Sequence, residues 1–115
     1  MSVEIYHNPR CSKSRQTLQL LKDHGVEPEI VEYLKTPPDR ATLERILDML
    51  GLEPRDLMRK KEQEYKDDNL ADPNLSRAQL IDAMLAHPRL IERPIVIKDG
   101  KAALGRPPEQ VLEII

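Results

Sequence analysis

Residues 6–21 read Y-H-N-P-R-C-S-K-S-R-Q-T-L-Q-L-L, and this stretch decides how the rest of the chain can fold. It holds the one cysteine of the sequence, Cys11, between a short apolar segment and a segment with helical spacing. Basic and imidazole side chains flank that cysteine: His7, Arg10, Lys13 and Arg15. A thiol at the positive end of a helix, among cations, loses its proton readily. The stretch therefore predicts a reactive cysteine that meets an anionic substrate.

A helix between two strands is the first unit that follows from this stretch. Residues 3–7 alternate apolar and polar side chains, as a half-buried strand does. A helix is predicted over residues 12–24, with Gly25 ending it and with two leucines facing inward, Leu18 and Leu21. Residues 29–33 predict a second strand. A strand, a helix and a strand in this order favour a parallel pair with a right-handed crossover.

The middle of the chain predicts helices. Residues 43–50 place apolar side chains at helical spacing, and Gly51 ends that run. Residues 53–58 indicate a short helical piece, and the charged residues 59–68 indicate an exposed helical excursion or loop. Ser76 is a favourable N-cap for another helix. The side chains expected to face inward from that helix are Leu80, Ile81, Met84 and Leu85.

The last part of the chain predicts a hairpin followed by a helix. Residues 95–98 are rich in strand formers, Asp99-Gly100 is a strong turn signal, and residues 101–104 form the returning strand. Pro107 favours the first turn of a final helix. Its buried side is expected to consist of Val111, Leu112 and Ile115.

This order of elements predicts an α/β fold, in which a mixed four-stranded sheet has flanking helices and the middle helices form an insertion. No Gly/Ser-rich linker divides the 115 residues, so we expect one domain over residues 1–115.

The composition narrows the class of function. A formal net charge of −2 gives no basic field for a nucleic acid or an anionic membrane surface. A single cysteine forms no internal disulfide, which favours the reducing cytoplasm, and the first residues do not resemble a signal peptide. No apolar stretch approaches the ~20 residues that span a bilayer. Because Cys/His clusters are absent from the sequence, we expect no metal site. We also expect no bound cofactor.

A cysteine after the first strand and a proline opening the third make this order resemble the thioredoxin fold. In that fold the peptide bond before the proline is cis and faces the active cysteine, so the resemblance implies a structural cis bond at Pro94. The redox version of the fold carries C-x-x-C, where this chain has Cys11-Ser12-Lys13-Ser14. Since Ser14 cannot resolve a disulfide on Cys11, a redox cycle here needs an external thiol.

Five blocks in the same order resemble one family over nearly the whole chain. They are H-N-P-x-C-x-x-S-R, L-x-R-K, Q-L-I-D-x-M-L-x-H-P, R-P-I-V and G-R-P-P. Together they resemble the glutaredoxin-coupled arsenate reductase family, which is thioredoxin-like and related to Spx-type proteins. The resemblance implies reduction of arsenate to arsenite through a thiol-arsenate adduct, in arsenic detoxification. It also implies glutathione as co-substrate and glutaredoxin as partner.

The resemblance places the family's nucleophile on Cys11. The three arginines that hold the oxyanion fall on Arg59, Arg93 and Arg106. A planar, always charged guanidinium can bind two oxygens of a tetrahedral oxyanion at once, which agrees with that role. The matching histidine is His7, expected to lower the pKa of the thiol electrostatically, and the matching Ser14 is expected to donate a hydrogen bond to the sulfur.

Two features leave the substrate open. Arg10 stands where the family often has a small residue, and Ser12-Lys13 replaces its common Gly-Thr. One alternative is a regulator of the Spx type that binds RNA polymerase, but Ser14 removes the C-x-x-C switch that such proteins commonly carry. Another is a thiol reductase of the same fold that acts on a different oxyanion or on glutathionylated targets.

Overall fold

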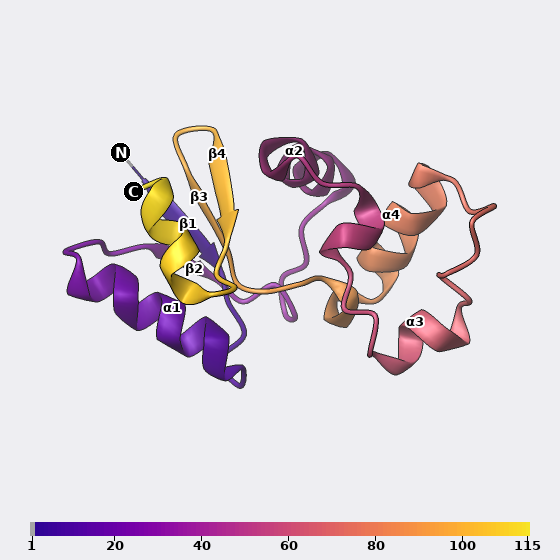
Figure 1. Cartoon of the computed structure of the whole chain (residues 1–115), viewed down its shortest axis with the longest axis horizontal. Helices are drawn as coiled ribbons and strands as arrows, with labels where there is room; N and C mark the ends of the chain where they lie inside the picture. Colours follow the sequence, from indigo (N-terminus) through magenta and orange to yellow (C-terminus); the bar gives the residue numbers. More distant parts are fainter. Residues whose placement is uncertain (1) are drawn as a thin grey trace. The chain divides into compact units, whose positions relative to one another are not determined.

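A four-stranded mixed sheet joins the first and last parts of the chain (Figure 1). The computed structural model describes residues 2–115, and its strands are β1 (Val3–Tyr6), β2 (Glu29–Val31), β3 (Ile95–Lys98) and β4 (Lys101–Leu104). Their order is β2-β1-β3-β4, with β2 parallel to β1 and with β3 antiparallel to both β1 and β4. The predicted mixed sheet and the parallel first pair are confirmed.

One face of the sheet is covered by α1 (Ser12–Asp23) and by the 3-10 helix η3 (Pro108–Glu113). The pairing of Ile5 with Val96 places both side chains on this face. A fully apolar core forms between the layers, and its buried residues are Val3, Ile5, Leu21, Val96 and Val111. Burial of each such side chain contributes about 1.5–3 kcal/mol to folding. This core fixes α1, and therefore its first residue, against β1.

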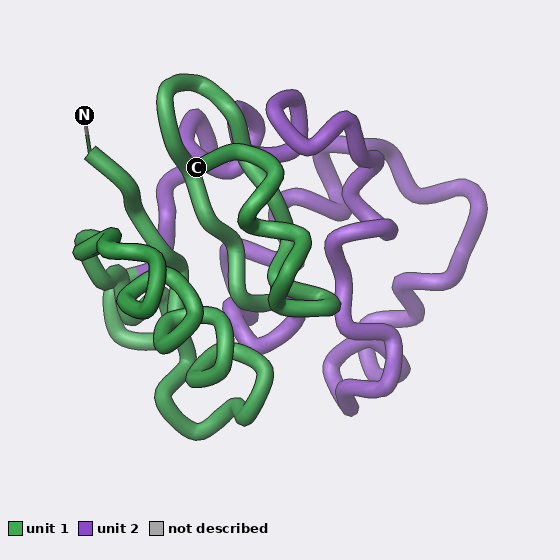
Figure 2. The backbone as a smooth tube through the Cα atoms, turned by 60° about the vertical axis from the view of Figure 1, so that its left-hand side comes forward, with its two compact units in different colours: residues 1–36, 93–115 green, residues 37–92 purple. Residues whose placement is uncertain are grey.

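The contacts of the chain divide it into two units (Figure 2). Unit 1 comprises residues 1–36 and 93–115 and contains the sheet, α1 and η3. Unit 2 is Pro37–Glu92, the middle part that the sequence indicated as an insertion. The expectation of a single domain over residues 1–115 stays a prediction.

Unit 2 is helical. Its elements are α2 (Arg40–Leu50), η1 (Pro54–Leu57), α3 (Gln63–Asp67), α4 (Arg77–Ala86) and η2 (Pro88–Leu90). Asp39 caps α2 by accepting from Thr42 N, and Gly51 ends that helix with a φ of 68°. Ser76 and Gln79 form a reciprocal capping box at the start of α4, as the N-cap preference of serine predicts. The buried apolar residues of this unit include Leu43, Ile46, Leu47, Leu57, Leu80, Ile81, Met84 and Leu90.

Three details differ from the sequence-based expectation. β2 ends at Val31, because the next residue, Glu32, starts a turn in which its carbonyl accepts from Lys35 N and Thr36 N. The last helix is of the 3-10 type, with hydrogen bonds between residues three apart, such as that from Gln110 N to Pro107 O. Four side chains expected in the core are only partly buried: Leu18, Leu85, Leu112 and Ile115.

The peptide bond between Arg93 and Pro94 is cis, as the resemblance to the thioredoxin fold implied. A second cis bond, Arg106–Pro107, was not expected. The two bonds follow the two arginines of unit 1 that the resemblance placed at the site. Among residues 2–115, no helix is long and apolar enough to cross a membrane.

Candidate active site

Cys11 is the N-cap residue of α1 and ends the loop that follows β1. The loop is closed by a hydrogen bond of 3.0 Å from Cys11 N to Asn8 O, and the helix begins with one of 3.0 Å from Arg15 N to Cys11 O. The residue is 9% exposed. Its sulfur makes no capping hydrogen bond of standard geometry, so the N–H groups of the first turn remain available to a thiolate or an anion.

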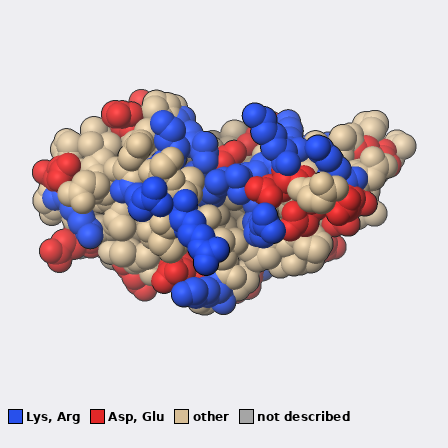
Figure 3. Space-filling view, turned by 90° about the horizontal axis from the view of Figure 1, so that it is seen from below, with Lys and Arg blue, Asp and Glu red and all other residues tan. Residues whose placement is uncertain are grey.

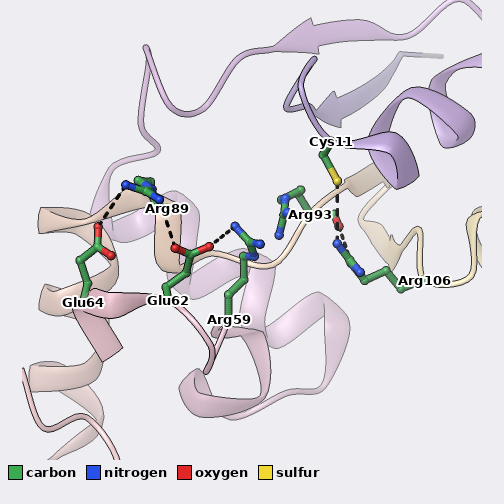
Figure 4. A network of polar contacts seen from close by, with 7 residues as sticks. All are labelled: Cys11, Arg59, Glu62, Glu64, Arg89, Arg93 and Arg106. Atoms are coloured by element: carbon green, nitrogen blue, oxygen red, sulfur yellow. Dashed lines mark hydrogen bonds and ion pairs between the residues drawn. The ribbon is translucent and has the colours of Figure 1, made fainter. Parts of the chain in front are cut away.

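Arg106 reaches the sulfur from the segment after β4 (Figure 4). Its Nη2 lies 3.8 Å from Cys11 Sγ, and its Nε donates a hydrogen bond of 2.8 Å to Arg93 O. The carbonyl of Arg93 therefore fixes the orientation of the Arg106 guanidinium. From the sequence, only the family resemblance suggested that Cys11, Arg93 and Arg106 lie together. The structure places them in one cluster.

Arg93 is itself buried, at 7% exposed. A guanidinium out of water needs negative charge or acceptors around it, because the cost of desolvating an uncompensated charge is several kcal/mol. Its positive charge lowers the pKa of Cys11. Arg93 is thus placed to stabilise either the thiolate or an oxyanion that arrives beside it.

The pKa of the Cys11 thiol lies below its ordinary value, although burial alone would raise it. The opposing causes are, in decreasing order, the backbone N–H of Ser14, the charge of Arg93, the backbone N–H of Lys13 and the charge of Arg106. Two of these causes are backbone dipoles at the helix N-terminus and two are guanidinium charges. The site therefore favours the nucleophilic form of the sulfur.

His7 and Ser14 form a buried pair behind the loop. His7 Nδ1 lies 2.6 Å from Ser14 Oγ, which also accepts a hydrogen bond of 3.0 Å from Asn8 N. Burial is the main cause that lowers the pKa of His7, opposed by Glu32, so the ring is neutral at pH 7. His7 therefore contacts the loop through Ser14, and its expected electrostatic effect on the pKa of Cys11 stays a prediction. Ser14 contributes its backbone N–H to the sulfur, while its hydroxyl holds the loop.

Arg59 belongs to unit 2, where it is held by a carboxylate (Figure 4). Its Nη1 lies 2.5 Å from Glu62 Oε1, and the other oxygen of Glu62 lies 3.3 Å from Arg89 Nη2. Its backbone N–H donates a hydrogen bond of 2.7 Å to Leu90 O. Backbone and side chain are both fixed, so this arginine is not part of a freely solvated charge run. Its role as an oxyanion ligand stays a prediction.

The positive field at Cys11 is local rather than general. Lys and Arg side chains gather in groups on the face shown in Figure 3, with groups of Asp and Glu beside them. The formal net charge of the chain remains −2. Among residues 2–115, no group of three or more His, Cys, Asp or Glu side chains could hold a metal ion.

This geometry, a thiol with a lowered pKa beside two arginines and a cis-proline, coincides with a family match. The ArsC family model matches residues 6–114. The chain belongs to the ArsC family.

Individual ArsC relatives match over almost their whole length. The chain is 63% identical over 114 residues to the uncharacterized protein YfgD of Escherichia coli (strain K12), covering 98% of this chain and 96% of that one. It is 48% identical to the arsenate reductase of Neisseria meningitidis serogroup A, covering 98% and 97% of the two chains. The solved arsenate reductase from Vibrio cholerae is 56% identical, with a TM-score of 0.98 and coverage of 100% and 98%. The predicted thioredoxin-like fold is thereby confirmed.

One supporting contact of this ArsC site was missed from the sequence. A Cβ atom built on Gly105 would collide with Thr17 Oγ1 and would lie 2.6 Å from Pro94 Cγ. Gly105 N also donates a hydrogen bond of 2.9 Å to Pro94 O. Thr17 is fully buried, and its hydroxyl donates to Lys13 O. A glycine directly before Arg106 was the available signal, since it marks close approach of the backbone.

Removal of the guanidinium of Arg93 or of Arg106 should raise the pKa of Cys11. Arg93→Met and Arg106→Met keep the length of the side chain but remove the charge that favours the thiolate. The midpoint of the iodoacetamide alkylation rate against pH should move to higher pH in each variant. Lys22→Met, an exposed charge change on the last turn of α1, is the control and should leave the midpoint in place. Equal midpoints in all four proteins would contradict the assignment.

Loss of the Ser14 hydroxyl should reduce stability more than it changes the thiol. Ser14→Ala leaves Asn8 N and His7 Nδ1 without their buried partner, at a cost of about 1–3 kcal/mol. The backbone N–H that faces the sulfur is kept, so the alkylation midpoint should move little. Urea unfolding measures the first effect, with exposed Ser12→Ala as control. A large upward shift of the midpoint at unchanged stability would instead show that the hydroxyl bonds to the sulfur.

A methyl group at Gly105 should disturb the site beyond its effect on stability. Gly105→Ala should push the segment away from Thr17 and Pro94 and so displace Arg106 from Cys11. The cost of overpacking is about 1–3 kcal/mol. Gly100→Ala is a matched control, because its φ of +76° costs about 1–2 kcal/mol although nothing lies within 4 Å. Both variants should unfold at lower urea, but only Gly105→Ala should raise the alkylation midpoint.

Proposed function

We propose that this ArsC-family chain reduces arsenate to arsenite, with Cys11 as the nucleophile. The observation that carries the proposal is the Cys11 thiol of lowered pKa, 3.8 Å from a guanidinium nitrogen of Arg106 and under the charge of Arg93. This environment suits a thiolate that attacks a tetrahedral oxyanion. Two relatives named arsenate reductases, at 48% and 56% identity, support the choice of substrate.

In the first step the Cys11 thiolate attacks the arsenic of hydrogen arsenate. A sulfur–arsenic bond forms, and one arsenate hydroxyl takes a proton and leaves as water. Negative charge stays on the remaining oxygens, where Arg93 and Arg106 can donate charge-assisted hydrogen bonds. The N–H groups of the first turn of α1 supply further donors. Arg59 is proposed as the third ligand of the oxyanion.

In the second step glutathione supplies the second thiol. Its thiolate attacks the Cys11 sulfur, the electron pair of the sulfur–arsenic bond stays on arsenic, and arsenite leaves. Arsenic gains two electrons, and the two thiols lose two as the mixed disulfide forms. Glutaredoxin then takes the glutathione by thiol–disulfide exchange and restores the Cys11 thiolate. An external thiol suits a chain that has one cysteine.

Production of arsenite by the purified protein tests the proposal directly. With arsenate, glutathione and glutaredoxin, the wild type should form arsenite, measured by chromatographic speciation, and Cys11→Ser should not. Arsenite at the level of the Cys11→Ser control would refute arsenate as the substrate. Turnover of glutathionylated proteins in its place would favour the general thiol reductase.

The arginines should contribute to arsenate turnover individually. Arg93→Ala and Arg106→Ala should each lower kcat/KM for arsenate by about 10²–10³-fold, the usual effect of losing one oxyanion donor. Arg59→Ala should do the same if it binds the oxyanion. Lys60→Ala is its matched control, since Lys60 is the exposed next residue. Equal kcat/KM for Arg59→Ala and Lys60→Ala would remove Arg59 from the site.

A further inference from the structure

A small cleft lies at the carboxyl ends of the two parallel strands, β1 and β2. Its volume is about 230 Å³, and its lining residues are His7, Asn8, Pro9, Arg10, Glu32, Leu34 and Lys35. One wall is the loop that ends at Cys11, and the other is the turn after β2. None of the three oxyanion arginines lines it. Carboxyl ends of adjacent parallel strands are a common place for ligands in α/β folds.

Both walls are held by hydrogen bonds that backbone N–H groups donate, so the cleft exists before a ligand arrives. His7 N donates a bond of 2.9 Å to Val31 O, which joins the two strand ends. On one wall, Arg10 N donates to Asn8 Oδ1 at 3.0 Å. On the other, the Glu32 carbonyl accepts from Lys35 N and from Thr36 N, each at 2.9 Å. A preformed site of this kind loses little entropy when it binds.

The charges of the cleft match an amino acid head group. Lys35 Nζ lies 3.5 Å from Glu32 Oε1, with 78% and 42% of the two side chains exposed. An exposed pair of this kind contributes at most about 1 kcal/mol, so either partner can exchange it for a ligand. Arg10 and Lys35 can bind the carboxylate of a ligand, and Glu32 can bind its ammonium group. Leu34, 40% exposed, adds an apolar wall for an aliphatic chain.

We propose that this cleft binds the γ-glutamyl end of glutathione, the thiol that reacts at Cys11. That end carries an ammonium and a carboxylate on one carbon, followed by two methylenes. The volume suits one arm of the tripeptide rather than the whole molecule, because pockets that enclose a small ligand usually measure about 300–1,000 Å³. Residues 8–10 form a wall of the cleft and lead directly to Cys11, so one short loop joins the cleft to the nucleophile. The inference rests on the proposed use of glutathione.

Reaction with disulfides tests the cleft without arsenate. The Cys11 thiolate attacks one sulfur of glutathione disulfide, a mixed disulfide forms, and one glutathione thiolate leaves. Intact-protein mass spectrometry gives the rate constant. Two comparison substrates are the disulfide of cysteinylglycine, which lacks the γ-glutamyl arm, and bis(2-hydroxyethyl) disulfide, which is uncharged. The neutral disulfide reports any change in the thiol itself.

The double variant Glu32→Gln/Lys35→Met should lower the rate constant with glutathione disulfide about tenfold, which corresponds to two exposed ionic contacts. Its rate constants with the two shorter disulfides should fall much less. The matched control is Glu29→Gln/Lys101→Met, which removes the same charges from the opposite end of the sheet, where Glu29 pairs with Glu4 and Lys101 with Lys98. It should react like the wild type.

An equal loss with all three disulfides, or no loss with glutathione disulfide, would overturn the assignment. These outcomes are separate from the arsenate assay. If the wild type forms no arsenite and the double variant loses the preference for glutathione disulfide, the proposed cleft stands and arsenate is refuted as the substrate. If the wild type forms arsenite and the double variant keeps the preference for glutathione disulfide, the proposed reaction stands and the cleft is refuted as the glutathione site.

Discussion

The N-cap residue of α1 is a cysteine whose sulfur makes no capping hydrogen bond, and the site depends on this replacement of an oxygen cap by a thiol. Two other helices have the usual side-chain caps, Asp39 on α2 and Ser76 on α4. A Ser, Thr, Asp or Asn cap is worth about 1 kcal/mol to a helix, which α1 forgoes. In return, its first N–H groups and its dipole act on the Cys11 sulfur. The apolar core beneath α1 supplies the stability that lets this helix end remain open.

Arg93 and Arg106 come to this helix end because β3 lies beside β1. Arg93 directly precedes β3, and Arg106 follows β4 and bonds back to the Arg93 carbonyl. The close contact among Thr17, Pro94 and Gly105 holds these segments against α1. The strand pairing, the hydrogen bond to the Arg93 carbonyl and the contact at Gly105 together place two guanidinium groups near the Cys11 sulfur. The buried charge of Arg93 is then stabilised by the same thiolate whose pKa it lowers.

The bounds of β3 and β4 were predicted to the residue. Pro94 directly precedes β3, and the turn residues Asp99-Gly100 separate the two strands. The sequence did not show that Ser14 and Thr17 are buried on α1, since their partners lie in other segments and hydroxyls usually face solvent. The charge state of His7 depends on burial, which no local pattern reports. The replacement of the family's common Gly-Thr by Ser12-Lys13, by contrast, has a simple explanation. Lys13 acts on the sulfur through its backbone N–H, which any residue except proline would supply.

A single cysteine explains why one loop should have two functions. A chain with two thiols can resolve its own disulfide, whereas the cycle proposed for Cys11 needs a second thiol that diffuses in. Capture of that thiol beside the nucleophile replaces a bimolecular encounter with a step between held groups, which can lower a barrier by several kcal/mol. The loop after β1 is suited both to the reaction and to the proposed capture of the thiol. Its end presents Cys11, and its side forms one wall of the cleft. Arg10, which departs from the family's usual small residue, then has a physical reason: it belongs to the cleft wall.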